Sequence, residues 1–513
     1  MQSAGKRVEV LVIGAGFGGI GVGINLLKDG VTDFVIIEAE DDVGGTWRTN
    51  RYPGCACDVP SHLYSYSFEP NPSWESAFSG HKDIERYIQH CADKYGVRPH
   101  IQFGTKVTRA DFDEEHGRWR VETHDGRVFD ARILVPATGG LSRLKYPEIP
   151  GRKAFEGQSV HAARWNPELS LEGKRVGVIG TGASAIQIVP SVANEVRRLS
   201  VFQRNAAWVL PKFNRQFTDD EHRRWATSPW RQRLRRLKVY WFMEMALPAL
   251  LWFPKLLGLA EFVHKWRLKR TIKDPVLRRK LTPDYRIGCK RSLVSDTYLK
   301  TFCRENVDLV TDGIERIVPE GIQTTDGVTH PLDILIYATG YAAGAPAFPY
   351  EIRGLGGVSL KDYWGVRKRA YYGMNVAGFP NLVMIMGPNT APGHTSVLVY
   401  QEPQYAYVVK YLRHLTQKRL RYLDVKESVQ DAQFDEFQDR LKGSSWGSGC
   451  TSWYLNQDGT NSAIWPSFSF AYGLQLRRFH VGAYREIGSV ASVAQSEASQ
   501  SAGESLGDGQ RVT

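Results

Sequence analysis

The sequence predicts an α/β fold in which two Rossmann-like dinucleotide-binding domains carry an inserted helical subdomain. Three observations predict it: a glycine-rich turn after an apolar run near the amino terminus, a second such pair near residue 180, and a basic segment of helical apolar spacing between residues 213 and 285. A chain of 513 residues is too long for one ordinary core, so we expect two or three lobes.

The first nucleotide segment begins at Val8–Ile13, an apolar run that predicts a buried parallel strand. The turn GAGFGG then opens a helix that runs to about Lys28, and a second strand, Phe34–Ile37, ends at Glu38. Glycines at this spacing let the backbone approach a pyrophosphate, and an acid after the second strand accepts hydrogen bonds from an unphosphorylated ribose. The candidate ligands are therefore Gly14, Gly16, Gly19 and Glu38, and the site is predicted to hold FAD.

A second glycine pair follows in GGTWRTNRYPGCACD, residues 44–58. Gly44 and Gly45 allow close approach to a pyrophosphate, and the Tyr-Pro-Gly turn redirects the chain. Asp58 is either a turn cap or a carboxylate that orients a cation near a flavin. The segment DVPSHLYSYSF, with Tyr64, is expected to form a loop and a short helix over the isoalloxazine.

The segments that complete the first lobe lie far apart in the sequence. Residues 101–133 alternate apolar and polar side chains, which predicts a β-meander that returns to the nucleotide lobe at residues 137–139. The last third, residues 350–478, is expected to return to the same lobe, with residues 381–394 as a strand and helix start near the flavin ring.

The second nucleotide segment repeats the pattern with one change of charge. Residues 174–179 predict a strand, and GTGASAIQ places Thr181 to Gln187 at the head of a helix whose amides suit a phosphate. The next strand, residues 199–203, ends at Arg204, a cation that accommodates a 2′-phosphate. This site is therefore predicted to hold NADPH. Further strands are predicted over residues 307–322. The segment DILIYATGY, residues 333–341, repeats the Ala-Thr-Gly of residues 137–139, and both segments are interpreted as points where the chain crosses between the lobes.

The insertion carries the charge imbalance of the chain. Between Arg223 and Lys280 there are 16 Lys and Arg against three acidic residues, a net +13, while the whole chain is +12. Tryptophan and phenylalanine side chains lie among these cations, so an interfacial membrane contact or another anionic partner is one interpretation. A solvated helical face with its aromatics packed inward is the other, and we favour it at about two to one. No recognition motif accompanies the charge, so nucleic acid is not expected.

Other features exclude several classes of protein. The amino terminus lacks a signal peptide, no run of about 18 apolar residues predicts a spanning helix, and no metal site is predicted. The six cysteines are irregularly spaced and suggest no disulfide framework, so we expect a cytoplasmic protein. Residues 489–513 lack apolar periodicity and are predicted to form a disordered tail.

With these pieces in place, the chain resembles the type I Baeyer-Villiger monooxygenases among the class B flavoprotein monooxygenases. The pattern FxGxxxHxxxW is met by Phe155, Gly157, His161 and Trp165 between the two glycine turns. The pattern GGxWxxxxYPGxxxD is met over residues 44–58. The phrases DVPSHLYSYSF, GCKRSLVSD and SWYLNQDGTN are most similar to the hydroxyacetophenone-type branch. Ala185 gives the second turn a GxGxxA form, which fits that branch.

The resemblance implies a set of site residues. Arg291 matches the active-site arginine, Asp58 the carboxylate that pairs with it by bidentate contact, and His161 and Trp165 positions in an interdomain connector. Lys290 and Arg204 match the groups that hold the 2′-phosphate of NADPH. The implied pyrophosphate loop of NADPH is Thr181, Gly182, Ala183, Ser184 and Gln187, and the implied flavin and adenine contacts are Glu38, Gly45, Thr46, Trp47, Asp58, Tyr64 and Val107.

The resemblance also implies the reaction. NADPH reduces FAD, O2 adds to give a C4a-peroxyflavin, and a ketone substrate becomes an ester or lactone. A flavin-dependent N- or S-monooxygenase is the alternative, against which Trp165 argues. A disulfide or quinone reductase would need a CxxC pair, which Cys55 and Cys57 do not form. A non-enzymatic dinucleotide-binding scaffold or membrane-associated adaptor depends only on the basic insertion. The ketone and the oligomeric state are not predicted.

The expected domain boundaries follow the order of the motifs. The segments are 1–150 (first part of the FAD domain), 151–212 (first part of the NADPH domain), 213–285 (basic helical insertion), 286–338 (second part of the NADPH domain), 339–488 (second part of the FAD domain) and 489–513 (tail).

Overall fold

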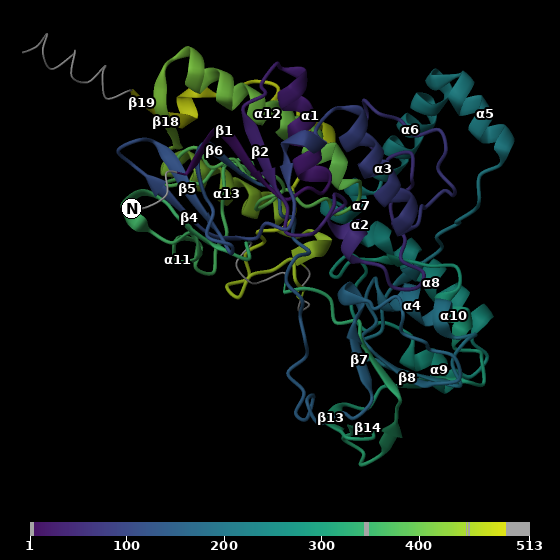
Figure 1. Cartoon of the computed structure of the whole chain (residues 1–513). Coiled ribbons are helices and arrows are strands. Elements are labelled where there is room, and N and C mark those ends of the chain that lie inside the picture. The colour runs from purple at the N-terminus through teal and green to yellow at the C-terminus, as the bar shows by residue number, and fades with distance from the viewer. Residues whose placement is uncertain (1–4, 343–347, 448, 450–451, 489–513) are drawn as a thin grey trace, which may run out of the picture.

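The computed structural model describes residues 5–342, 348–447, 449 and 452–488, and it shows two open sheets with helices against their faces (Figure 1). The expected α/β class with two Rossmann-like units and a helical insertion is confirmed. The predicted disordered tail, 489–513, lies outside the described residues. The domain boundaries by cofactor stay a prediction.

The first sheet has seven strands in the order β17-β4-β5-β6-β1-β2-β3. Its central strand β1 is fully apolar where it is buried, and it pairs in parallel with β2 and β6. The predicted meander is confirmed, because β4, β5 and β6 pair antiparallel in chain order. The strands are β1 (Lys6–Ile13), β2 (Phe34–Ile37), β3 (Ile101–Gln102), β4 (Val107–Asp113), β5 (Arg118–Thr123), β6 (Val128–Pro136) and β17 (Glu351–Arg353).

The second sheet has five strands in the order β12-β9-β8-β16-β7, all parallel. It lies below the first sheet in Figure 1, beside the small hairpin sheet β13-β14-β15. The strands are β7 (Gln158–His161), β8 (Arg175–Ile179), β9 (Arg198–Phe202), β12 (Val307–Val310) and β16 (Ile334–Tyr337), followed in the hairpin sheet by β13 (Ile314–Val318), β14 (Gly321–Thr324) and β15 (Thr329–Pro331).

The carboxyl-terminal third covers the first sheet, as predicted. Helix α12 (Val397–Gln417) lies along α1 (Phe17–Lys28), and a methyl group built on Gly21 would lie 2.2 Å from the Tyr405 ring. The remaining elements of this lobe are α2 (Thr46–Thr49), α3 (His81–Lys94), α11 (Leu360–Trp364), α13 (Glu427–Leu441), α14 (Ser469–Leu476) and the antiparallel pair β18 (Leu420–Val425) and β19 (Tyr484–Gly488).

The insertion is helical, as predicted, and touches both lobes. It contains α5 (Asp219–Thr227), α6 (Pro229–Glu244), α7 (Leu247–Leu251), η3 (Pro254–Leu257), α8 (Gly258–Thr271) and α9 (Pro275–Lys280). Among the described residues, no single helix is long and apolar enough to cross a membrane. The segments Pro229–Leu251 and Pro254–Thr271 together have the required length and apolar character, but the chain bends by 116° between them.

Two local predictions are wrong. The segment 58–68 contains turns and no helix. Residues 381–394 contain no strand beyond single bridges, although Val383 and Ile385 donate to the edge of β6. Left-handed backbone at Asn381, Met386 and Asn389 interrupts this segment, and α12 begins only at Val397. An apolar run such as NLVMIM therefore lies beside a sheet without extending it.

A buried carboxylate fixes α6 to the first lobe. The Glu244 carboxylate lies 3.1 Å from Nε2 of His394, and the Ser469 hydroxyl and amide donate to it at 2.5 and 3.2 Å. The Glu244 and His394 side chains are each 1% exposed. Burial by itself raises the pKa of Glu244, but the bonds from His394 and Ser469 outweigh it, so this pKa lies below its usual value.

Replacement of Glu244 by Ala should destabilise the fold by about 3 kcal/mol, because it leaves buried donors without an acceptor. Urea unfolding of wild type and variant at neutral pH measures this. The lowered pKa means that the carboxylate stabilises the fold above its unfolded-state pKa and loses this effect as the pH falls through the lowered value. The difference between the two proteins should therefore shrink in acid, and an equal difference at all pH values would contradict the assignment. Glu244→Gln, which keeps one acceptor, is the matched control.

Candidate active site

The first glycine turn requires glycine at two positions. Gly14 has φ +106°, and a methyl group there would lie 2.8 Å from the carbonyl oxygen of Ala137. A methyl group on Gly19 would lie 1.8 Å from the carbonyl oxygen of Gly14. Because α1 begins at Phe17 with no side-chain cap, the amides of this turn suit a phosphate.

Glu38 lies where the predicted ribose ligand belongs. Its carboxylate accepts a bond from the Ala15 amide at 2.6 Å and from the Glu40 amide at 2.9 Å, which places it against the glycine turn. Burial raises the pKa of Glu38. The Thr105 amide donates to the Glu38 carbonyl at 2.8 Å, so the segment that leads to Val107 lies beside it. The structure thus brings Glu38, Val107 and the first turn together.

The second glycine pair converges on the first turn. A methyl group on Gly45, where φ is +53°, would lie 3.0 Å from Cα of Gly16, so the two backbones form a narrow cradle. Helix α2 then begins at Thr46, and the Trp47 indole donates to the Tyr64 hydroxyl at 3.1 Å. The cradle, which a side chain would fill, fits the pyrophosphate of a dinucleotide.

Arg291 and Asp58 meet from positions 233 residues apart. Nη2 of Arg291 donates to Oδ2 of Asp58 at 2.5 Å, and Nε donates to the same oxygen at 3.1 Å. The expected bidentate contact is therefore wrong in detail, since both N–H groups converge on one oxygen. The Arg291 side chain is 48% exposed, so its other N–H groups lie within reach of a bound molecule.

The pair is stabilised in its charged form. Burial alone raises the pKa of Asp58, but the charge and hydrogen bond of Arg291 outweigh it and hold this pKa below its usual value. The Asp58 charge in turn raises the pKa of Arg291. The same two charges act on the hydroxyl of Tyr64, whose pKa burial raises. The ion pair therefore lies near Tyr64, which is bonded to Trp47 beside the cradle of the two glycine turns.

Two neighbours of this pair, Tyr454 and Lys212, were not predicted from the sequence. Tyr454 is buried, and the Arg291 charge opposes the rise that burial causes in its pKa. Burial lowers the pKa of Lys212, and the negative charge of Asp58 acts against this. The Asp296 carboxylate accepts a hydrogen bond from the Lys212 amide at 2.9 Å and so fixes the loop that contains Lys212. Tyr454 belongs to SWYLNQDGTN, which carries part of the resemblance, but no motif marks Lys212.

A disulfide lies close to Arg291 in the sequence. Cys289, two residues before Arg291, is buried and disulfide-bonded, which the irregular cysteine spacing did not suggest. Cys55, Cys57, Cys91 and Cys303 are free thiols.

The second glycine turn differs slightly from the prediction. Helix α4 (Ala185–Val192) begins four residues after Thr181, so residues 181–184 form an open turn. The Thr181 hydroxyl donates to the carbonyl of Asn205 at 2.9 Å. Gly182 and Ala183 are exposed, which leaves the backbone of the turn accessible.

Gln187 connects the two lobes in this structure. Its amide oxygen accepts the Tyr52 hydroxyl at 3.0 Å and the Ala56 amide at 3.3 Å, while its nitrogen donates to the Ala56 carbonyl at 2.9 Å. The second glycine turn is therefore held against the segment that leads from Gly45 to Asp58.

The two cations expected to bind a 2′-phosphate lie together. Lys290 Nζ donates to Oδ1 of Asn205, the neighbour of Arg204, at 3.4 Å. Burial and then repulsion from Arg204 lower the pKa of Lys290. A pair of cations that repel each other favours a doubly charged anion between them.

The connector lies at the crossing between the lobes. His161 ends β7, is 2% exposed, and accepts the Ala163 amide at Nδ1 over 3.1 Å. Its ring contacts the ring of Tyr146. Next to Tyr146, the Lys145 amide donates to the carbonyl of Gly340, which joins the two segments that cross between the lobes. Burial lowers the pKa of His161, so the ring is neutral at pH 7.

The other connector residues are closely packed against their neighbours. A methyl group on Gly157 would lie 2.5 Å from the Phe155 ring and from the carbonyl of Asp333. Trp165 is half-buried, and the preceding Arg164 pairs with Glu40 at 3.1 Å. These contacts suit a positioning role for the connector, which stays a prediction.

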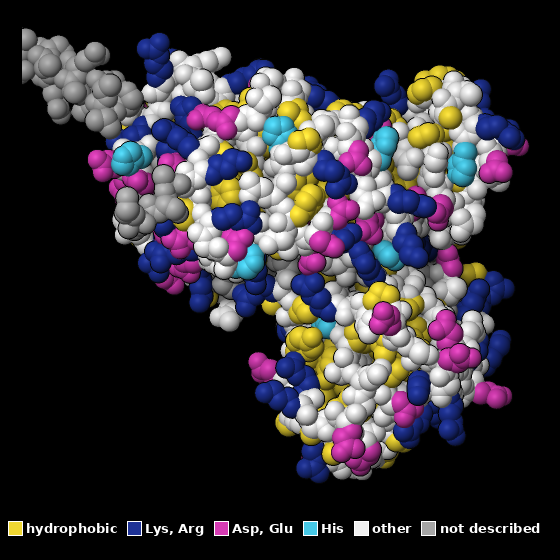
Figure 2. Space-filling view, in the orientation of Figure 1, with side chains coloured by type: hydrophobic (Ala, Val, Ile, Leu, Met, Phe, Trp, Pro, Cys, Tyr) yellow, Lys and Arg dark blue, Asp and Glu magenta, His cyan; other side chains and the backbone are white. Residues whose placement is uncertain are grey.

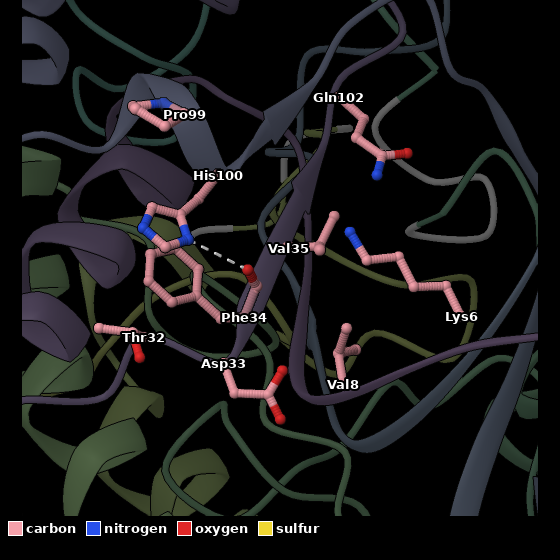
Figure 3. A pocket seen from close by; sticks show the side chains of 9 residues that line it. All are labelled: Lys6, Val8, Thr32, Asp33, Phe34, Val35, Pro99, His100 and Gln102. Carbon is pink, nitrogen blue, oxygen red and sulfur yellow. Dashed lines mark hydrogen bonds between the residues drawn. The ribbon is translucent and has the colours of Figure 1, made fainter.

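A hollow of about 210 Å³ lies elsewhere, at the amino ends of β1 and β2 (Figure 3). Lys6, Asp33 and His100 line it, and the His100 ring stacks on Phe34. Ligands of parallel sheets bind beyond the carboxyl ends of the strands, so this hollow is not the dinucleotide site.

Comparison with known proteins gives consistent relatives. Residues 5–355 match the family described as FMO-like, flavin-binding monooxygenase-like. A protein of Streptomyces coelicolor named Baeyer-Villiger monooxygenase is 42% identical over 482 residues, which cover 94% of this chain and 93% of the relative. An oxidised steroid monooxygenase bound to NADP is 31% identical with a TM-score of 0.85, over 94% of this chain and 100% of that structure. OTEMO, in complex with FAD and NADP, is 27% identical with a TM-score of 0.85, over the same shares.

Proposed function

The chain belongs to the flavin-binding monooxygenase-like family and, within it, to the Baeyer-Villiger monooxygenases, and we propose that it uses FAD, NADPH and O2 to convert a ketone into an ester or lactone. The observation that carries this proposal is the Arg291–Asp58 ion pair beside Tyr64 and the flavin cradle.

FAD fits the first lobe. Gly14, Gly16 and Gly45 would hold its pyrophosphate where their missing side chains leave room, and Glu38 would accept the ribose hydroxyls. NADPH fits the second lobe, where Arg204 and Lys290 would bind its 2′-phosphate. When bound, the flavin would supply the redox chemistry that transfers one oxygen atom of O2 to the ketone, with NADPH as the reductant.

Arg291 would stabilise negative charge in this reaction. Its guanidinium carries a permanent charge, and Asp58 fixes one edge of it. The remaining N–H groups would donate to the oxyanion that forms when the ketone carbonyl is attacked. Buried Tyr454 and half-buried Tyr64 supply apolar surface near the guanidinium, and a bound substrate that excludes water from its exposed edge would strengthen this interaction.

Incubation of the purified, flavin-loaded protein with NADPH, O2 and a panel of cyclic, aryl and long-chain ketones tests the proposal. Mass spectrometry should detect products heavier than the ketone by one oxygen atom, with the label from ¹⁸O2 incorporated. Amines and sulfides in the same panel test the alternative activity. Oxidation of these soft nucleophiles without any ester would overturn the proposal.

Replacement of both Cys55 and Cys57 by Ala should leave ester formation within about threefold of wild type, because neither thiol takes part in the chemistry. Burial raises the pKa of Cys55 to about 12, so a thiolate does not form near pH 7. Product formation per bound flavin measures the effect. Loss of ester formation in a variant that retains its flavin spectrum would contradict this expectation.

A further inference from the structure

Helix α6 presents its apolar side chains to solvent. Large hydrophobic residues recur at every third or fourth position on its outer side and are 42–78% exposed. They are Trp230, Leu234, Leu237, Trp241, Phe242 and Met245. A surface helix of a globular protein normally carries such a stripe toward the core, so α6 is inverted.

Polar contacts fix this orientation. On the inner side of α6, Gln232 donates to the carbonyl of Asn71 at 2.5 Å, and Arg236 donates to the carbonyls of His62 and Ser65, each at 2.9 Å. Glu244 is held by His394 and Ser469 as described above. Rotation that buried the apolar stripe would break all of these bonds, so the exposed stripe belongs to the folded structure.

The exposed surface continues over the next helices. Trp252, Phe253, Leu256, Leu259, Phe262 and Trp266 of the η3 and α8 region are 47–71% exposed. Aromatic contacts join the two parts: Trp241 lies 6.0 Å from Phe470, Phe470 stacks on Phe468 at 5.1 Å, and Phe468 lies 5.5 Å from Trp252. We call these twelve residues and Phe470 the apolar helical face.

Positive charge surrounds this face. Between residues 229 and 273, all described, nine Lys and Arg are exposed, whereas Glu244 is buried and Glu261 is half-buried and accepts the Ile287 amide. Figure 2 shows hydrophobic side chains next to Lys and Arg over the region of α5 and α6. The exposed cations are Arg231, Arg233, Arg235, Lys238, Lys255, Lys265, Lys269, Arg270 and Lys273.

We propose that the apolar helical face lies on the surface of an anionic lipid bilayer, with α6 and α8 in the interfacial plane. Tryptophans beside cations suit the headgroup boundary, where a ring has an apolar environment on one side and water on the other. A second copy of this chain fits less well, because a two-fold interface would bring like charges together. The 116° bend and the cations along both helices favour lying on the bilayer over crossing it.

Vesicle flotation of the flavin-loaded full chain tests the proposal. We expect the protein to float with vesicles of phosphatidylcholine and phosphatidylglycerol in equal parts, weakly with phosphatidylcholine alone, and less as salt increases. The double variant Phe242→Ser/Phe262→Ser should bind the mixed vesicles at least about tenfold more weakly. The triple variant Lys265→Gln/Lys269→Gln/Arg270→Gln should also bind more weakly, and should lose most of the preference for anionic lipid.

The matched control is Val328→Ser/Val358→Ser, two residues of similar exposure outside the face, 48% and 46%. It should float like wild type. Flavin absorbance and unfolding temperature establish that each variant is folded, and if the serine variant loses flavin, the charge variant and the salt series decide the question. Absence of wild-type flotation, or flotation that ignores lipid charge and salt, would overturn the proposal. So would a wild-type dimer that Phe242→Ser/Phe262→Ser converts to a monomer without any vesicle binding.

Discussion

Replacement of Arg291 by Ala is expected to reduce ester formation by about a thousandfold or more, while NADPH still reduces the bound flavin. The charge of the guanidinium acts on the hydroxyls of both Tyr64 and Tyr454, and Asp58 holds the guanidinium by two N–H groups. Its loss removes stabilisation of developing negative charge but leaves both dinucleotide turns intact. Anaerobic bleaching of the flavin by NADPH measures the first half-reaction, and product mass in air measures the second.

Two further variants separate charge from geometry. Arg291→Lys keeps a cation without the planar guanidinium, so its rate of ester formation should lie between those of wild type and Arg291→Ala. Asp58→Asn should keep part of the activity, because the cation remains but its orientation is less fixed. Ester formation by Arg291→Ala at the wild-type rate would exclude the proposed role. Loss of flavin reduction together with oxygenation would place Arg291 in NADPH binding instead.

The strands and turns of both lobes follow from local signals. An apolar run before a glycine turn predicts a buried strand and a helix start, because the residues that determine strand burial and the conformation of the turn lie within about twenty positions of one another. This is why Val8–Ile13, the first turn and the position of Glu38 could be predicted. The start of α4 was displaced to Ala185, since helix boundaries depend on contacts that the pattern does not contain.

The features that escaped prediction depend on distant contacts. Residues 381–394 have the composition of a strand, but left-handed backbone at Asn381 and Met386 confines the pairing with β6 to the few residues between them. The Asn381 side chain donates to the carbonyl of Gly117. Lys212 approaches Asp58, and Tyr454 approaches Arg291, only after the lobes assemble. The outward stripe of α6 shows that the favoured interpretation of the insertion, with its aromatic side chains packed inward, was wrong. The apolar spacing is the same whether the stripe faces the core or solvent, and the inner bonds of Arg236 decide the orientation.

The preference for NADPH over NADH should fall by roughly a hundredfold or more when Arg204 and Lys290 are both replaced by Gln. Each cation would lose a charge-assisted bond to the 2′-phosphate, worth about tenfold or more in affinity. The KM for NADPH should rise, whereas kcat/KM for NADH should change little, because NADH carries no group for these cations to bind. Steady-state oxidation of both nucleotides by the flavin-loaded protein measures this.

A cation at the opposite end of the same strand provides the control for that prediction. Arg198 begins β9, four residues before its last member, and pairs with Asp308 at 2.6 Å on an exposed surface. Arg198→Gln removes the same charge at a greater distance along the strand, so it should alter neither KM. A parallel loss with NADPH and NADH in the double variant would indicate a general effect on the second lobe. A selective loss with NADPH would instead follow from the mutual repulsion of Arg204 and Lys290, which a bound phosphate relieves.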